Sequence, residues 1–225
     1  MKKENAAAEI ETMIEIIPGI LEKNFDDISK KISQVKDLAP WIHIDVLDNT
    51  LIQNVTYNLW ESFKVFNGEI KFEAHLMVSD PHKYVHSMAE NGFDRLIAHV
   101  EAHTVREFIA EGRTAHIEIG VAIDGPSELE MIEPFLSEVD CVLVMMYKAG
   151  LSGQTFQPNH LPKIRKIHEE YQHLPIEVDG GISKESAPLV INAGATRLVS
   201  TSYLFWKNAD RIAEAIEELK LGMRG

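Results

Sequence analysis

Four residues of the kinds that bind divalent cations lie at the ends of apolar stretches in this sequence. His43 and Asp45 alternate with apolar residues in the stretch 41–48, which reads Trp-Ile-His-Ile-Asp-Val-Leu-Asp. His75 precedes Leu-Met-Val, and Asp179 ends Ile-Glu-Val-Asp before two glycines. Alternate side chains of a strand point to the same face, so His43 and Asp45 share one face while the isoleucines share the other.

Two imidazoles and two carboxylates that meet among apolar side chains predict a metal site. Burying two carboxylates without a partner is costly, and a divalent cation between them offsets that cost. The set suits zinc, iron(II), manganese or cobalt, and the ligands alone do not choose among these metals. With room for a substrate oxygen, the ion would act as a Lewis acid. The alternative interpretation is a structural network of His–Asp hydrogen bonds.

The elements that must position these residues alternate along the chain. Short runs rich in Ile, Val and Leu have the length of strands, and longer amphipathic stretches between them have helical spacing. The predicted strands are 15–18, 41–47, 70–78, 95–100, 117–123, 141–147, 175–179 and 197–200. The predicted helices include 26–38, 82–91, 127–136, 160–171, 186–193 and 210–219.

This order predicts an α/β protein with a single closed (β/α)8 barrel, the TIM barrel. Strands separated by helices pair in parallel, because a parallel return needs a crossover. About eight such units in about 220 residues match a closed barrel. The alternative is a doubly wound open sheet, but no Gly-x-Gly-x-x-Gly follows the first predicted strand. In a barrel, functional residues belong at the C-terminal ends of the strands, where the four candidates fall.

Length and composition limit the other classes of protein. The chain has 225 residues, with 22 Lys+Arg against 35 Asp+Glu, a net charge of −13 and one cysteine. This acidic balance argues against nucleic acids or anionic membranes as partners. No apolar run reaches the roughly 18 residues of a membrane span, and Cys141 alone makes no disulfide framework. We expect one domain over 1–225, with 1–12 as an N-terminal extension, and a cytoplasmic location.

Three loops are candidates for binding an anion or covering a ligand. Gly180-Gly181 follows the seventh predicted strand, and Thr201-Ser202 follows the eighth. Loops at these two places form the usual phosphate site of such barrels, where backbone N–H groups face the anion. The glycine pair also has a simpler explanation, since turns use glycine for positive φ. The third loop, 150–154, contains Gly153 and could close over a ligand.

In combination, these motifs resemble the ribulose-phosphate 3-epimerase family of (β/α)8 barrels, which are of the ribulose-phosphate-binding type. The resemblance runs in order from about Ile17 to Phe205. It includes the stretches 41–48, 75–78, 99–102, 150–156 and 177–182. The family interconverts D-ribulose 5-phosphate and D-xylulose 5-phosphate with a divalent metal. The resemblance therefore implies one divalent metal ion and a small-molecule sugar phosphate as substrate, and it suggests a homo-oligomer.

The resemblance also implies roles for single residues. The family's four metal ligands match His43, Asp45, His75 and Asp179, and its two acid–base carboxylates match Asp45 and Asp179. Its methionines that line the enediolate match Met77, Met145 or Met146, with Leu47 at a third position. The candidates for phosphate binding are Gly153, Gly180, Gly181, Thr201 and Ser202. His99 has a family counterpart but is given no metal role.

The sequence departs from the family in loops near the phosphate and over the site. Pro18-Gly19-Ile20 stands where the family has Pro-Ser-Ile, so a hydroxyl that contacts the site is missing. The family's Asp-Gly-His-Phe-Val-Pro-Asn is replaced over 48–54, and its Asn-Pro-Gly-Phe-Gly-Gly-Gln over 148–154. The Gly-Ser of its phosphate loop is Thr201-Ser202 here. The type of reaction is therefore better supported than the substrate.

We therefore expect an epimerase that inverts C3 of D-ribulose 5-phosphate through an enediolate, a step of the pentose phosphate pathway. One alternative is a 3-epimerase of a hexulose 6-phosphate such as allulose 6-phosphate, since some relatives of that kind carry a Thr-Ser pair in the phosphate loop. Another is a non-catalytic barrel that binds a sugar phosphate or a metal for regulation. The intact pair of aspartates argues against the non-catalytic barrel, because binding alone needs no second base.

Overall fold

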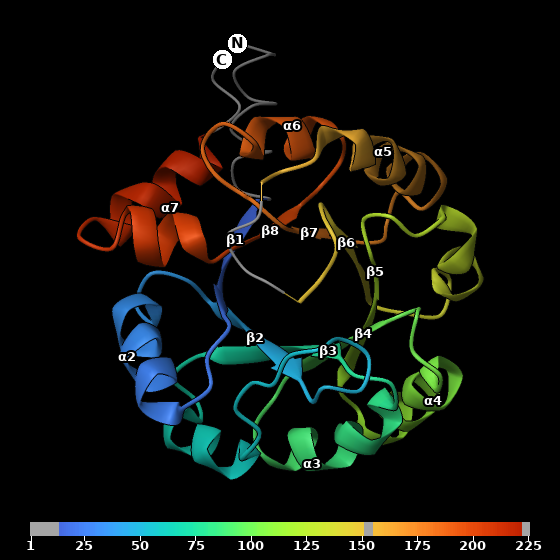
Figure 1. The fold of residues 1–225 in the computed structure, drawn as a ribbon, viewed down its shortest axis with the longest axis horizontal. Helices are drawn as coiled ribbons and strands as arrows, with labels where there is room; N and C mark the ends of the chain where they lie inside the picture. Colours follow the sequence, from blue (N-terminus) through green and yellow to red (C-terminus); the bar gives the residue numbers. More distant parts are fainter. Residues whose placement is uncertain (1–13, 151–154, 222–225) are drawn as a thin grey trace.

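The computed structural model describes residues 14–150 and 155–221. In them, eight strands close into a barrel in chain order, and every neighbouring pair, including β8 with β1, is parallel (Figure 1). The predicted (β/α)8 barrel is confirmed, and the alternative of an open sheet is wrong. The predicted extension at 1–12 lies outside the described residues, and the assignment of the whole chain to one domain stays a prediction.

The strands match the predicted ranges to within a few residues at each end. They are β1 (Glu15–Ile20), β2 (Trp41–Leu47), β3 (Lys71–Met77), β4 (Arg95–His99), β5 (Glu118–Ile123), β6 (Cys141–Met145), β7 (Ile176–Asp179) and β8 (Arg197–Ser200). The α-helices are α2 (Phe25–Val35), α3 (Val85–Glu90), α4 (Val105–Ala115), α5 (Leu161–Glu170), α6 (Ala187–Asn192) and α7 (Ile212–Lys220). The 3-10 helices are η1 (Trp60–Phe66), η2 (Pro81–Tyr84), η3 (Leu129–Met131), η4 (Glu133–Phe135) and η5 (Pro158–His160). The element η6 (Tyr203–Lys207) is a π-helix.

The helix predicted over 127–136 is wrong. The chain makes two single 3-10 turns there, η3 and η4. Pro134 lies in the first turn of η4, and a proline lacks the N–H that an α-helix through this stretch would need. Conversely, α4 lies outside the predicted helices, although Val105, Phe108 and Ile109 carry its buried face at helical spacing.

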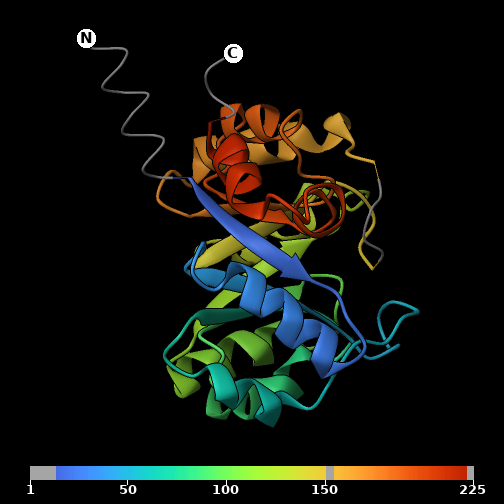
Figure 2. The same cartoon turned by 90° about the vertical axis from the view of Figure 1, so that its left-hand side faces the viewer.

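The strand next to α2 illustrates how the barrel and its helices pack. Asn24 caps α2 by accepting a hydrogen bond from the Asp27 backbone N–H at 2.9 Å. Ile28, Ile32 and Val35 form the buried face of the helix. Figure 2 shows α2 lying alongside β1, which runs obliquely across the molecule. This apolar layer between strands and helices continues around the barrel and makes the larger part of the core.

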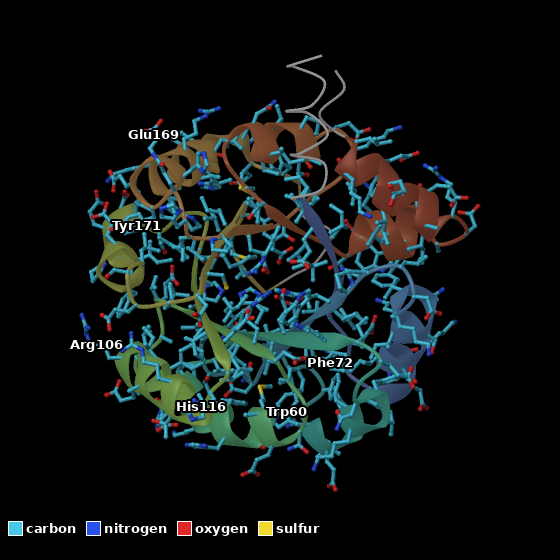
Figure 3. The ribbon with its side chains drawn as sticks, turned by 180° about the vertical axis from the view of Figure 1, so that it is seen from behind. Trp60, Phe72, Arg106, His116, Glu169 and Tyr171 are labelled. Atoms are coloured by element: carbon cyan, nitrogen blue, oxygen red, sulfur yellow. The ribbon has the colours of Figure 1, made fainter. Side chains whose placement is uncertain are left out.

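On the outer face of β2 and β3, which faces away from the barrel interior, the core consists largely of aromatic side chains. The ring of Phe72 lies 5.3 Å from that of Phe63, and the ring of Trp60 meets Phe93 edge-on at 6.2 Å. Figure 3 shows Trp60 and Phe72 on the same side of the barrel, seen from behind. Burial of each such ring contributes about 1.5–3 kcal/mol to stability. This packing holds firmly the two strands that carry three of the four candidate ligands.

The barrel interior holds two small apolar clusters and a group of buried charges. One cluster consists of Ile17, Trp41 and Val199. The charged group consists of Glu73, Arg95 and Glu177, all fully or almost fully buried. The second apolar cluster includes residues that line the mouth beside the aspartates; it comprises Leu47, Met77, Ile97, Ala122, Cys141, Leu143, Met145, Tyr147 and Ala149. Among the described residues, no helix is long and apolar enough to span a membrane.

Candidate active site

The four predicted ligands meet inside the C-terminal mouth of the barrel. His43 and Asp45 lie on β2, and His75 lies on β3 with its Cα paired in register with that of Asp45. Asp179 ends β7, and because all the strands of the barrel are parallel, this end lies at the same mouth. One ligand atom of each residue lies within 4.8 Å of those of the other three. The alternation expected from the sequence thus places all four on the inner face of the barrel.

Hydrogen bonds and charge make the two aspartates unequal. Asp45 Oδ1 lies 3.1 Å from His75 Nδ1 and 3.3 Å from His43 Nε2. Burial alone would raise the pKa of Asp45, but these two imidazoles hold it well below its ordinary value. Burial and the charge of Asp45 raise the pKa of Asp179 to about 7. One carboxylate is ionised and the other titrates near neutrality, which is a pattern of paired acid and base groups.

A layer of buried charges lies directly beneath the four residues. Glu73 accepts a hydrogen bond from Arg95 Nη1 at 2.6 Å and lies 2.7 Å from His43 Nδ1. Arg95 also stacks on Trp41, with its guanidinium carbon 3.9 Å from the ring centroid. Because the charges of His43 and Arg95 outweigh the effect of burial, the pKa of Glu73 falls to about 2. Glu73 therefore accepts the proton of His43 Nδ1, which fixes the orientation of that ring.

Glu177 belongs to the same layer but behaves differently. It is fully buried, and neither of its carboxylate oxygens has a hydrogen-bond partner among the described residues. Burial and the charge of Glu73 raise the pKa of Glu177 to about 7. Neither Glu73 nor Glu177 was among the residues predicted from the sequence. A signal was available, because each lies two residues before a selected ligand and therefore on the same strand face.

The four residues fit a divalent cation. Within the part of the chain that the structure describes, His43 Nε2 is buried without a hydrogen-bond partner, although it faces the aspartates. Its other ring nitrogen is held by Glu73, an arrangement typical of histidine ligands whose second nitrogen meets a carboxylate. Burial lowers the pKa of His75 to about 4, so that ring is neutral and able to coordinate. A cation would supply the partner that His43 Nε2 lacks and balance both carboxylates.

A small cavity of about 20 Å³ opens beside the aspartates. Its lining includes both predicted methionines and several residues of the mouth: Leu21, Asp45, Met77, Met145, Tyr147, Gly150, Asp179 and Thr201. Tyr147 and Leu21 were not predicted at the site. A larger hollow of about 560 Å³ lies at the opposite end of the strands, around Glu15, Pro175 and Arg197. It holds none of the four candidate ligands, so its size does not make it the reactive site.

The predicted phosphate residues are only partly brought to this cavity. Thr201 lines it, and Ser202 begins the turn of η6 next to it. Gly180 and Gly181 follow Asp179 with φ values of +118° and +68°. A Cβ on Gly181 would lie 2.7 Å from the backbone nitrogen of Phe156, so close packing alone requires glycine there. Gly153 lies outside the described residues.

The loops after β7 and β8 are tied to each other. The strands pair in register, with Asp179 opposite Val199. Beyond this pair, the Ser200 hydroxyl donates to the carbonyl of Ile182 at 3.2 Å. The two loops that carry the phosphate candidates therefore form one edge of the mouth, on the side of Asp179.

Comparisons with known proteins agree with this geometry. The family model of the ribulose-phosphate 3 epimerase family matches residues 15–205. A ribulose-phosphate 3-epimerase of Bacillus subtilis (strain 168) is 34% identical over 220 residues, which is 92% of this chain and 99% of the relative. Another of Schizosaccharomyces pombe is 31% identical over 215 residues, covering 93% of this chain and 92% of the relative.

Solved structures share the fold at lower identity. A KGPDC from Streptococcus mutans, solved as a ligand complex, superposes with a TM-score of 0.74 at 17% identity, covering 94% of this chain and 98% of that one. The 3-hexulose-6-phosphate synthase from Salmonella typhimurium gives a TM-score of 0.72 at 15% identity, with 93% and 98% covered. These likenesses show the barrel alone. The family match and the identities over nearly the whole of both relatives establish more: the chain is an enzyme of the ribulose-phosphate 3-epimerase family, whose named members are carbohydrate epimerases.

Proposed function

We propose that this enzyme inverts C3 of D-ribulose 5-phosphate to form D-xylulose 5-phosphate, with one divalent ion held by His43, Asp45, His75 and Asp179. The observation that carries the proposal is the convergence of these four side chains, with ligand atoms within 4.8 Å of one another, at the reactive end of the barrel. The ion would be zinc, iron(II), manganese or cobalt. Family membership supports the substrate.

Asp45 and Asp179 would serve as the two acid–base groups. The C3 proton of the ketose phosphate lies next to the carbonyl, so its removal leaves a planar enediolate. Inversion needs one group to take the proton from one face and another to return a proton to the opposite face. Asp45 comes from β2 and Asp179 from β7, which are separated around the barrel by β8 and β1.

The other residues of the mouth would support this proton transfer. The bound ion would stabilise the negative charge that develops on the substrate oxygens. Met77 and Met145 line the cavity with thioethers that cannot take up a proton near neutral pH, and Leu47 packs in the same cluster. These apolar walls would exclude water and protect the enediolate from side reactions.

The substrate phosphate would lie at the edge formed by the loops after β7 and β8. Backbone N–H groups of Gly180 and Gly181, with the hydroxyls of Thr201 and Ser202, are the candidate contacts there. Gly153 belongs to the same proposal on the strength of the family resemblance. A single-domain organisation, a homo-oligomeric assembly and a cytoplasmic location complete it, and size-exclusion chromatography with light scattering would measure the assembly.

Deuterium exchange tests the reaction. The purified enzyme is incubated in heavy water with ribulose 5-phosphate, with and without a chelator, and the sugar is followed by NMR. We expect deuterium at C3 together with xylulose 5-phosphate, and loss of both when the metal is removed. A parallel reaction with allulose 6-phosphate compares a hexulose substrate. A folded, metal-loaded protein that exchanges no proton of any ketose phosphate would instead favour a sugar-phosphate-binding barrel.

A further inference from the structure

Tyr147 is the bulkiest residue that lines the small cavity beside the aspartates, and it has no part in the proton transfer proposed above. It follows β6 by two residues and is 5% exposed. Its side chain belongs to the apolar cluster that also contains Leu47, Met77 and Met145. A phenol in such a place joins an apolar ring to one polar group, so its role depends on what the hydroxyl meets.

Contacts with the neighbouring loops hold Tyr147 in place. Its carbonyl accepts a hydrogen bond from the Gly125 N–H at 3.2 Å, and the Met146 N–H donates to the carbonyl of Asp179 at 2.8 Å. The ring lies against Gly180, where a Cβ would come within 3.0 Å of Tyr147 Cε1. The missing side chain at position 180 therefore makes room for the ring next to Asp179.

The hydroxyl of Tyr147 is left without a protein partner. It forms no hydrogen bond with residues 14–150 or 155–221, and it is not among the side-chain atoms of those residues that are sealed from water without a partner. The oxygen is therefore open to the space that Tyr147 lines, which is the cavity. Because a tyrosine hydroxyl in a buried position usually has a partner, this one points to a partner that enters the cavity from outside.

The hydroxyl keeps its hydrogen at every pH at which the enzyme would work. An ordinary phenol has a pKa of about 10, which is already well above neutrality. Burial and the charges of Asp179 and Asp45 raise the pKa of Tyr147 further, since a phenolate there would be poorly solvated and repelled by both carboxylates. Tyr147 is thus a constant hydrogen-bond donor beside the two acid–base groups.

The rest of the cavity wall offers little that could stabilise a developing negative charge. Asp45 and Asp179 only accept hydrogen bonds when they are ionised, and the two methionines contribute thioethers. Thr201 carries the other hydroxyl among the lining residues, and it lies at the edge proposed for the phosphate. The donor nearest in kind to what a charged sugar oxygen needs is therefore Tyr147.

We propose that Tyr147 is a further catalytic residue, whose hydroxyl donates a hydrogen bond to the substrate oxygen that gains negative charge as the C3 proton leaves. The inference rests on the proposed function and adds a neutral donor to the acid–base pair. The cavity has both aspartates in its wall, so the reacting carbon and its oxygens would lie beside the phenol. A donor already fixed in place stabilises the charged oxygen more than the neutral ketose, and that difference raises the rate.

Tyr147→Phe removes the donor and keeps the ring. For ribulose 5-phosphate, kcat should fall about 10²–10³-fold, the usual cost of losing one such donor, while KM changes little. Tyr171→Phe makes the same change at the end of α5, outside the cavity lining, and should match the wild type. A Tyr147→Phe enzyme that keeps the wild-type kcat would overturn the proposal.

Two further measurements separate catalysis from packing and from substrate binding. Tyr147→Phe should be at least as stable to heat as the wild type, because the hydroxyl it removes has no protein partner. It should also bind the pentitol 5-phosphate made by reducing the substrate as well as the wild type does, since that sugar has no carbonyl and forms no enediolate. A loss of stability would mean that the hydroxyl serves packing, and a loss of pentitol affinity equal to the loss of activity would mean that it only binds; either result overturns the proposal.

The activity of the wild type distinguishes this test from that of the proposed function. A wild type that epimerises ribulose 5-phosphate, beside an equally active Tyr147→Phe, refutes the donor alone. A folded, metal-loaded wild type that exchanges no proton of any ketose phosphate refutes the proposed function, and the donor with it.

Discussion

Gly19 and Thr201 share one space at the seam where β1 meets β8. A Cβ on Gly19 would lie 2.4 Å from Thr201 Oγ1 and 2.9 Å from a methyl carbon of Val199. The family pattern has a serine at position 19 and a glycine at position 201. This chain has Gly19 and Thr201 instead, so it departs from the pattern at both positions. The structure joins these two departures: the Thr201 hydroxyl lies where a side chain at position 19 would begin.

This contact predicts that substitutions at the two positions are coupled. Gly19→Ser alone should destabilise the protein by about 1–3 kcal/mol, because the new side chain meets Thr201 and Val199 in a packed interior. Combining it with Thr201→Gly should restore much of that loss, since the competing hydroxyl is gone. Urea unfolding of the wild type, both single variants and the double variant gives the coupling energy. Strictly additive losses would show that the two positions do not share a space.

The two aspartates should have separable parts in proton transfer. Asp45→Asn and Asp179→Asn should each lower epimerisation by at least about 10²–10⁴-fold, because each removes the group that acts on one face. Each variant should also lose deuterium exchange from a different epimer, ribulose 5-phosphate in one and xylulose 5-phosphate in the other. Asp26→Asn, which changes an exposed aspartate in the first turn of α2, is the matched control. Full turnover in either site variant would exclude a two-base mechanism.

Metal binding should strengthen as pH rises. Burial and the charge of Asp45 raise the pKa of Asp179 to about 7, so below pH 7 the metal-free protein holds a proton there that the cation must displace. Each displaced proton makes the apparent affinity rise about tenfold per pH unit. Carboxylates raise the pKa of His43 well above its ordinary value despite burial, whereas His75, at about 4, is already neutral.

Calorimetry counts these protons directly. Titration with Zn²⁺ in two buffers of different ionisation enthalpy should release about one more proton at pH 6 than at pH 8. Asp179→Asn should abolish that difference, since an amide at position 179 holds no titrating proton. An equal count at both pH values in the wild type would mean that Asp179 is ionised throughout.

Glu177 should make the metal-free protein less stable at high pH. Its pKa rises from 4.5 to about 7 on folding, chiefly through burial and then through the charge of Glu73. A folded-state pKa above the unfolded one adds stability below the unfolded value, and that contribution is lost as pH rises through the folded value. Relative to Glu177→Gln, the wild type should therefore lose up to about 3 kcal/mol between pH 4.5 and 7.

Urea unfolding of both metal-free proteins across this range measures the difference. Glu107→Gln, an exposed change of the same kind, should follow the wild type at every pH. A wild-type stability that rises against Glu177→Gln over the same interval would show that Glu177 is ionised and paired when folded.

The residues of the metal cluster could be read from the sequence because the signal is local. Period-two alternation in 41–48 separates His43 and Asp45 from the isoleucines, and His75 and Asp179 fall at the ends of equally apolar strands. Apolar strands alternating with amphipathic helices were enough to predict the barrel. The same local reasoning failed at 127–136, where Pro134 breaks a helix that the apolar spacing suggested.

The residues that stand behind the ligands depend on how the barrel closes. Glu73, Arg95 and Glu177 come from three strands and form one layer only because the sheet closes with a particular stagger. The same closure brings Gly19 of β1 to Thr201 after β8, whereas His99 meets His75 through the direct pairing of β3 with β4. A single strand's alternation tells which face a side chain takes, but the depth at which strands far apart in the chain are matched depends on register across the whole barrel. Local patterns in the chain therefore specify the barrel and the four ligands, and the closed sheet specifies the charges that orient them.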